Sequence, residues 1–261
     1  ELVHTSEETA EPCVNRLDGF LGWRAGRSGH VPLFQSLYSP RVQFVGRGCD
    51  FHRVPGTYES FFPKYAEQLA YGEQIGWTHY LTVCYPSPRR GFLKKLAHCR
   101  WALADFLNSA EMEAPLAFAE PVPTLSTEWG VCEPNPVTVD KVLHSTWRHV
   151  DGRRLVMFLN VTDAPQDVAP VWTRGGKAFA ICREMSAAPV AASAAPTRVK
   201  LPPYGFEFWF VGDGPSPEAA TLAPRLAKAA RFWADDRGEM LAQKPAFEKT
   251  AQIDAAGGKP V

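Results

Sequence analysis

The fold of the second half of the chain is decided by the segment KVLHSTWRHVDGRRLVMFLNV, residues 141–161. Two apolar runs of strand length, Lys141 to Val150 and Arg154 to Val161, lie on either side of Asp151-Gly152. An Asp-Gly pair between such runs favours the tight turn of a β-hairpin, because glycine adopts positive φ without strain. The segment therefore predicts two antiparallel strands.

Short strand patterns continue on both sides of this hairpin. From about Met112 onward the chain reads as brief apolar runs separated by turn residues, with further strands expected at residues 168–173, 178–183, 198–201 and 206–211. This spacing is typical of a sandwich, so residues 111–214 predict an antiparallel β-sandwich. The low-complexity run Ala187–Pro196 is expected to be an exposed linker. Helical spacing returns at Glu218–Ala234, and residues 215–261 predict a helical, partly disordered tail.

Residues 1–110 have a different rhythm, in which strand and helix patterns alternate. Alternation of this kind is typical of βα units around a parallel sheet, so the region is predicted to be α/β. The expected strands are Leu2–Thr5, Val31–Tyr38 and Val42–Val45, and the expected helices are Glu11–Leu21, Tyr58–Tyr71 and Phe92–Leu107.

The length of the α/β region limits what it can be. A complete (β/α)8 barrel takes roughly 250 residues, so about 110 residues supply only three or four of its eight units. The chain also starts at Glu1 within a strand pattern, and we expect further sequence upstream. The predicted fold is therefore α/β plus all-β: the C-terminal half of a (β/α)8 barrel, an antiparallel β-sandwich and a C-terminal helix. A small, self-contained α/β layer is the alternative for residues 1–110.

Composition and charge exclude several classes of protein. The 261 residues are 45% hydrophobic and 21% charged, a globular rather than a disordered profile. Lys+Arg 28 balance Asp+Glu 28, so the chain lacks the one-sided charge that attracts nucleic acid or an anionic membrane. No apolar run approaches the ~18 residues of a membrane span. We expect a soluble protein, cytoplasmic or secreted, without nucleic-acid or membrane partners; its oligomeric state is left open.

Motifs for cofactors and metals are missing from the sequence. There is no Gly-x-Ser-x-Gly elbow, no phosphate-binding loop and no dinucleotide fingerprint. The six cysteines include no Cys-x-x-Cys pair, and the metal-like grouping Cys49-Asp50-His52 has no second pair at zinc spacing. We therefore expect neither a cofactor nor a metal.

An acidic stretch follows the first expected strand. Thr5 to Pro12 contains Glu7, Glu8 and Glu11 where a strand ends and a helix begins, the place where barrel enzymes carry catalytic groups. A carboxylate there can protonate a leaving oxygen or attack a sugar carbon if a second one stands about 5–10 Å away. The alternative is that these glutamates occupy the first turn of a helix, where the helix dipole favours negative charge.

Aromatic residues near predicted strand ends fit sugar binding, because the apolar face of a pyranose packs on a ring. Trp23 and Tyr38 are expected to be exposed, and Phe34 and Trp101 buried. The segment Tyr71–Trp77 offers Glu73, Gln74 and Trp77 as ligand contacts in a cleft-lining loop. The competing interpretation of that segment is a helix C-cap followed by a surface turn.

Four stretches together resemble a family: SEETAEP at 6–12, LDGFL at 17–21, VPLFQSLY at 31–38 and YGEQIGW at 71–77. In order and spacing they resemble bacterial glycoside-hydrolase-like TIM-barrel proteins, described only as a domain of unknown function. The hairpin region 147–162 and LPPYGF at 201–206 are similar to the β-sandwich that follows such barrels. Family members tend to read Thr-Glu-Gly-Asn-Ala-Glu at Ser6–Glu11, so Glu7 and Glu11 are retained while Glu8 replaces the glycine.

The resemblance implies the C-terminal part of a glycoside hydrolase with a carbohydrate substrate. Glu7 is the expected catalytic residue, and its partner carboxylate is expected upstream, so the chain is predicted to be inactive by itself. The expected substrate-binding residues are Glu11, Asp18, Trp23, Tyr38, Glu73 and Trp77. The alternative is a non-catalytic carbohydrate-binding or structural module in which the sandwich binds the sugar.

Overall fold

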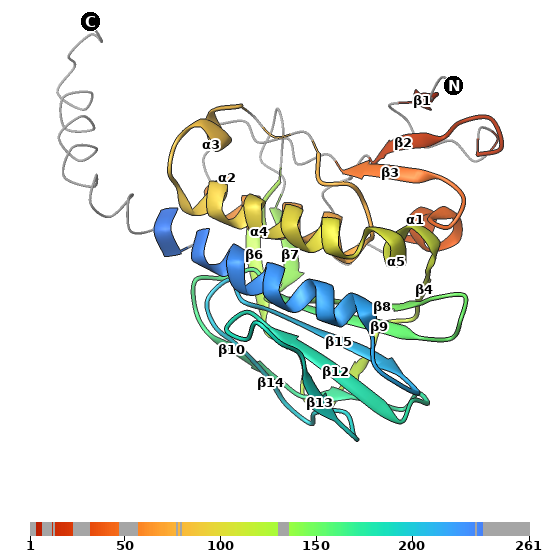
Figure 1. Ribbon diagram of the computed structural model, residues 1–261. Helices are drawn as coiled ribbons and strands as arrows, with labels where there is room; N and C mark the ends of the chain where they lie inside the picture. The colour runs from red at the N-terminus through yellow and green to blue at the C-terminus, as the bar shows by residue number, and fades with distance from the viewer. Residues whose placement is uncertain are drawn as a thin grey trace, which may run out of the picture.

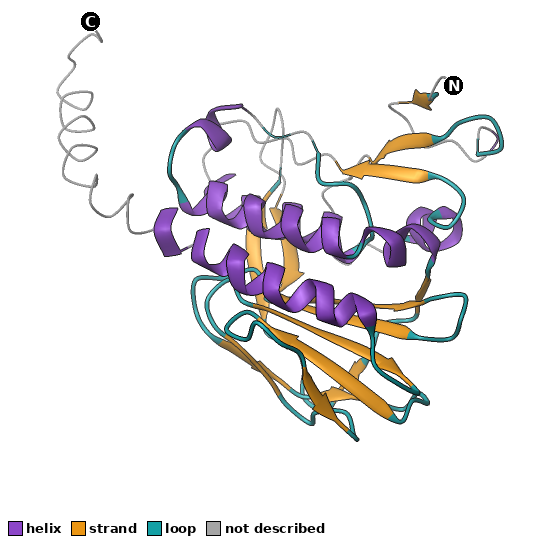
Figure 2. Cartoon of the chain, viewed as in Figure 1, coloured by secondary structure: helices purple, strands orange, loops and turns teal. Residues whose placement is uncertain are grey.

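The computed structural model describes residues 4–6, 12, 14–22, 32–46, 57–76, 78, 80–129, 136–232 and 234–236. The chain is a mixed α/β protein with a six-stranded antiparallel sheet, a smaller parallel sheet and several helices. Figure 2 shows the main helices as a layer between the parallel strands on one side and the antiparallel sheet on the other. Within the described residues, no helix is long and apolar enough to cross a membrane.

The hairpin predicted from residues 141–161 forms the centre of the antiparallel sheet. Strands β8 (Val142–Arg148) and β9 (Arg154–Asn160) pair from Val142↔Asn160 to Arg148↔Arg154, and Gly152 in their turn has φ 88°. The sheet order is β13-β12-β15-β9-β8-β4. Its other strands are β4 (Glu111–Glu113), β12 (Ala178–Arg183), β13 (Val190–Ala192) and β15 (Phe206–Gly212), which confirm the strands predicted at 178–183 and 206–211.

Alternation along the central strands gives the sheet two apolar faces. On β9, Val156 and Phe158 pack in one core, and Leu155, Met157 and Leu159 in another. The first core is closed by the pair β10 (Gln166–Val168) and β14 (Val199–Leu201). Two further pairs join β5 (Ala117–Phe118) to β11 (Pro170–Val171) and β6 (Thr124–Glu128) to β7 (Pro136–Asp140).

Helices cover the second face of the sheet. They are α2 (Thr57–Ala70), α4 (Pro88–Ala102), α5 (Ala104–Ser109) and a helix over 217–232, which lies beside α4 (Figure 1). Their apolar residues and those of β9 and β15 form one core, so the predicted helices at 58–71, 92–107 and 218–234 are confirmed in outline. The helix predicted over 92–107 is interrupted at Leu103, where α4 ends and α5 begins.

A buried ion pair fastens α4 to the sheet. Lys95 and Glu184 are both buried, with 2.5 Å between Nζ and Oε1. The same ammonium also donates to the carbonyl of Tyr204 and lies 4.2 Å from the centre of the Phe206 ring. The carboxylate in turn accepts from the backbone N–H of Phe206 at 3.0 Å.

The smaller sheet is parallel and follows chain order. Strands β1 (Thr5–Ser6), β2 (Gly19–Gly22) and β3 (Gln43–Gly46) lie side by side, and Gln74 adds a fourth parallel position through a bridge to Val45. Phe20 and Phe44 pack on Phe34 from α1 (Leu33–Tyr38). The predicted parallel α/β pattern is confirmed, while the described strands do not close into a barrel.

Several local predictions in this region were wrong. The strand expected at Val31–Tyr38 is α1, because Phe34 and Tyr38 share one side of a helix above the sheet, with their rings 4.8 Å apart. The helix expected at Glu11–Leu21 is not formed at its C-terminal end, where two glycines and buried Phe20 make β2.

Two predictions elsewhere also need correction. Part of the expected linker Ala187–Pro196 is strand β13, paired antiparallel with β12 at the edge of the sheet. Trp101 was expected to be buried but is 61% exposed, because it lies on the outer side of α4, where the Arg225 guanidinium stacks 3.4 Å from its ring centre. A cation over the ring takes the place of core packing there.

Candidate functional site

The carboxyl edge of the parallel sheet is the first candidate site. The strands are parallel and in register, with Gly22 opposite Gly46 and Val45 opposite Gln74, so their carboxyl ends meet at one edge. Ligand sites of α/β sheets lie at such edges. In the sequence, Glu7 follows the last residue of β1, Trp23 follows the last residue of β2, and Trp77 follows Gly76. These three residues and Glu11 lie outside the described residues.

Two glycines and a glutamine fix the described part of this edge. The Oε1 atom of buried Gln68 accepts from the backbone N–H of Gly76 at 3.0 Å. A Cβ atom on Gly46 would lie 2.3 Å from the Gln68 side chain, and one on Gly76 would lie 2.7 Å from the carbonyl oxygen of Gly46. Only glycine fits at these two positions, because α2, β3 and the chain that follows Gln74 lie very close to one another.

Two of the predicted substrate-binding residues lie at the opposite, amino edge of the sheet. Asp18 directly precedes β2, is exposed, and its Oδ2 atom accepts from the backbone N–H of His4 at 2.8 Å. Tyr38 ends α1, before β3 begins, and is half-buried against Phe34. The structure does not bring these two side chains to the carboxyl edge.

Glu73 also lies at the amino edge, directly before Gln74, and is fully buried. Its Oε1 atom accepts from Nε2 of Gln35 at 2.7 Å, and its carbonyl accepts from Nε of Arg100 at 3.1 Å. Burial lowers the pKa of Arg100 to about 10, so the guanidinium stays charged at neutral pH.

Of the two interpretations of Tyr71–Trp77, the helix C-cap is confirmed for its first residues. Gly72 has φ 72°, its N–H donates to the carbonyl of Leu69, and the N–H of Glu73 donates to the carbonyl of Gln68. These are the closing hydrogen bonds of a glycine-terminated helix.

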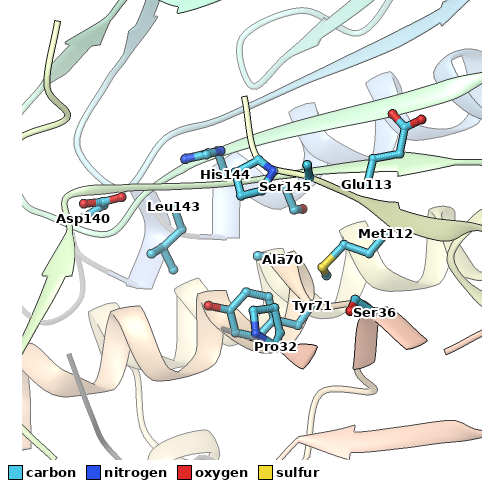
Figure 3. A pocket seen from close by; sticks show the side chains of 12 residues that line it. Pro32, Ser36, Ala70, Tyr71, Met112, Glu113, Asp140, Leu143, His144 and Ser145 are labelled. Atoms are coloured by element: carbon cyan, nitrogen blue, oxygen red, sulfur yellow. The ribbon is translucent and has the colours of Figure 1, made fainter. Parts of the chain in front are cut away.

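A second candidate is a cavity that we call the junction pocket, because it lies between the two sheets. Its volume is about 350 Å³ (Figure 3). Segments far apart in the sequence line it, which is why no local motif revealed it. The lining residues are Pro32, Ser36, Ala70, Tyr71, Met112, Glu113, Ala114, Pro115, Asp140, Leu143, His144 and Ser145.

The charged groups of the junction pocket differ in their surroundings. Glu113 pairs with Arg154 at 3.0 Å and with Arg174 at 2.9 Å. The Asp140 carboxylate has no ion pair or hydrogen bond among the described residues, and burial raises its pKa. Burial also lowers the pKa of His144 to about 4, so this imidazole is neutral at pH 7. Its ring packs 4.7 Å from Phe118, on the side of the sheet away from the helices.

The third candidate is an open hollow beside β12, which we call the sandwich groove. It has a volume of about 570 Å³ and is lined by Trp172, Phe179, Pro170 and the segment 193–197, among others. The ring centres of Trp172 and Phe179 are 5.7 Å apart in an edge-to-face arrangement, and the buried indole N–H of Trp172 has no hydrogen-bond partner among the described residues.

The chain is distantly similar in structure to parts of glycoside hydrolases. One is a GH30 endoxylanase from Clostridium papyrosolvens, with 10% identity and a TM-score of 0.41, matching 78% of this chain and 51% of that one. Another is α-galactosidase I from Mortierella vinacea, with 8% identity and a TM-score of 0.40, matching 77% and 55%. The chain spans about half the length of these solved structures. No protein-family model and no curated protein matches it.

Proposed function

We propose that the chain is the C-terminal part of a glycoside hydrolase, with the substrate site at the carboxyl edge of the parallel sheet. The observation that supports this proposal is the chain-order parallel array β1-β2-β3 with its fourth position at Gln74. In such an array the residues that follow the strands gather over one edge. Glu7, Trp23 and Trp77 are residues of that kind.

Glu7 is proposed as the catalytic carboxyl group. As an acid it would give its proton to the glycosidic oxygen as the bond to the anomeric carbon breaks, and a second carboxylate would activate water or form the glycosyl intermediate. That second carboxylate would come from Glu11 or from a part of the protein upstream of this chain. Trp23 and Trp77 are proposed to pack on the apolar faces of the sugar rings.

Asp18, Tyr38 and Glu73 have another proposed role. Each lies at the amino edge, and each contacts the framework: Asp18 holds His4, Tyr38 packs on Phe34, and Glu73 binds Gln35. We assign them to the support of the sheet rather than to the substrate, because the amino face of an α/β barrel serves stability.

The test is hydrolysis of a panel of aryl glycosides by the full protein that contains this chain. Glu7→Gln is compared with Glu8→Gln, a matched change at the next position. General acid catalysis contributes about 10²–10⁴-fold, so Glu7→Gln is expected to lower kcat by at least about 100-fold, with little change in KM. Glu8→Gln is expected to keep most of the activity. Undiminished turnover by Glu7→Gln would remove Glu7 from the mechanism.

A second candidate function is carbohydrate binding without catalysis, favoured by the half-buried Trp172 in the lining of the sandwich groove. Trp172 is half-buried in the lining of the groove and would present part of its ring face to a sugar ring. Affinity electrophoresis in gels containing soluble polysaccharides tests it. Retardation that is lost in Trp172→Ala but kept in Glu7→Gln would favour this module over the hydrolase.

A further inference from the structure

The junction pocket lies away from the proposed sugar site. Ala70 and Tyr71 stand at the C-terminal end of α2, just before the fourth parallel strand position, and therefore near the amino edge of the sheet. A ligand here would lie between the parallel part of the chain and the antiparallel sheet. Ligand binding in the junction pocket does not depend on the proposed glycosidase activity.

The interior of the pocket is mainly apolar. Figure 3 shows Leu143 and Met112 pointing from the strands toward Tyr71 and Pro32 across the cavity. Leu143, Met112 and Tyr71 are partly buried side chains at the margin of the main core, and all three line the cavity. A volume of about 350 Å³ is at the lower end of the ~300–1,000 Å³ range of ligand pockets, which suits a small molecule.

The charged side chains that line the pocket are acidic. None of the twelve lining residues is a lysine or an arginine. Glu113 is surrounded by Arg148, Arg154 and Arg174 at 3.7, 3.0 and 2.9 Å, but the partly buried carboxylate of Asp140 has no partner among the described residues. A partly desolvated carboxylate without a counter-charge is costly, and a cation beside it would recover that cost.

The apolar interior and the carboxylate of Asp140 together define the class of ligand that fits the pocket. An anion is disfavoured by Asp140, and a polyhydroxylated sugar would leave most of its hydroxyl groups facing apolar side chains. An ammonium group with an apolar body satisfies the carboxylate. Its methyl or methylene groups would pack against the ring of Tyr71 and the polarisable thioether of Met112.

We propose that the junction pocket binds a small organic cation, an amine or quaternary ammonium compound, with its charge beside Asp140 and its apolar groups against Tyr71, Met112 and Leu143.

The test compares choline with 3,3-dimethylbutan-1-ol, a neutral molecule of almost the same shape, in calorimetric titrations of the chain. Choline is expected to bind at least about 10-fold more tightly than the alcohol, a ratio that corresponds to one charge-assisted contact. Asp140→Asn, which keeps the shape of the side chain, is expected to abolish this difference. Asp163→Asn, at an exposed aspartate outside the pocket, is expected to preserve it.

The location of binding is read independently from the four methionine methyl groups, labelled with ¹³C. The methyl signal of Met112 is expected to shift with choline, while that of Met185, which is 89% exposed, stays in place. The proposal is overturned if the two ligands bind equally, if choline does not bind at millimolar concentration, or if Asp140→Asn leaves the preference for choline unchanged. A shift of Met112 caused by oligosaccharides but not by choline would also overturn it.

Discussion

At the scale of single residues, Lys95 decides how α4 is held on the antiparallel sheet. Its ammonium is fully buried and shares hydrogen bonds with Glu184 and the carbonyl of Tyr204. Removing one member of a buried pair leaves the other charge without compensation, which costs about 3–5 kcal/mol. We therefore expect Lys95→Met to lower the free energy of unfolding by about this amount, measured by urea denaturation.

The neighbouring Lys94 supplies the control. Its ammonium is partly exposed, 3.9 Å from Asp236 and 4.9 Å from the centre of the Phe232 ring. Asp236 is buried and already paired with Arg90 at 2.5 Å, so the longer contact of the partly exposed Lys94 is expected to contribute only about 0–1 kcal/mol and Lys94→Met to be nearly neutral. Equal losses in the two variants would show that the Lys95–Glu184 pair has no special role. Adding Glu184→Gln to Lys95→Met should recover part of the stability, because it removes the uncompensated carboxylate.

His144 predicts a dependence of stability on pH. Burial lowers the pKa of the folded-state imidazole to about 4, below its ordinary value near 6.5. The contribution of neutral His144 is therefore complete above pH 6.5 and is lost as the pH falls from 6.5 to about 4, since the unfolded chain binds the proton first. The loss is on the order of 3 kcal/mol.

The measurement is the difference in unfolding free energy between the wild type and His144→Phe, taken by urea titration at pH 7.5 and pH 4.5. The variant keeps Asp140 and all other titrating groups, so their contributions cancel. We expect the wild type to lose more stability than the variant on acidification. Parallel losses would mean that His144 is protonated without cost in the folded protein.

At the scale of elements, the end of α2 depends on one glycine. Gly72 has φ 72°, and a Cβ atom there would lie 2.6 Å from the indole of buried Trp147, whose N–H donates to the carbonyl of Ala70 at 3.2 Å. Gly72→Ala therefore combines backbone strain of about 1–2 kcal/mol with a clash against a core side chain.

Gly152 in the hairpin turn provides a matched comparison. Its φ is 88°, but a Cβ atom there would meet nothing within 4 Å. We expect Gly152→Ala to cost only the backbone strain of about 1–2 kcal/mol, and Gly72→Ala to cost at least about 1 kcal/mol more. Thermal unfolding followed by circular dichroism measures both. A larger loss for Gly152→Ala would mean that Trp147 moves aside without cost.

The elements that could be predicted from the sequence are those whose signal is local. The hairpin was correct because its turn residues and the apolar runs on either side lie within 21 residues of each other. The strand predicted at Val31–Tyr38 was wrong, because a short apolar run fits either a strand or a helix. Only the packing of Phe34 on Phe20 and Phe44 decides between the two.

The candidate site was harder to predict for a related reason. A motif gives the order of residues along the chain, but whether a residue lies at the carboxyl or the amino edge depends on where each strand begins and ends. Glu73 illustrates this, since it lies on the amino side of Gln74 and turns inward to Gln35. Asp140 could not be predicted as a pocket residue, because only the lining residues of β8 are near it in the sequence and the others lie in or next to α1, α2 and β4.

At the scale of the whole molecule, one core connects the parts that the sequence analysis separated near residue 110. Leu69 of α2, Leu96 of α4, Met157 of β9 and Leu226 of the helix over 217–232 belong to the same buried cluster. The change at residue 110 is therefore a change in the type of secondary structure across a shared core. The parallel strands have their own small core around Phe20 and Phe44, and Gln68 of α2 joins their carboxyl edge to the larger core through its hydrogen bond with Gly76.

The most direct test of the proposed sugar site uses the eight tryptophans of the chain as reporters. Their indole N–H signals are recorded by ¹⁵N nuclear magnetic resonance while gluco-, xylo-, galacto- and arabino-oligosaccharides are added, a method that detects weak binding. If the substrate site is at the carboxyl edge, the signals of Trp23 and Trp77 shift with at least one sugar while that of Trp172 does not. A shift at Trp172 without any change at Trp23 and Trp77, or no shift with any sugar, would contradict the proposal.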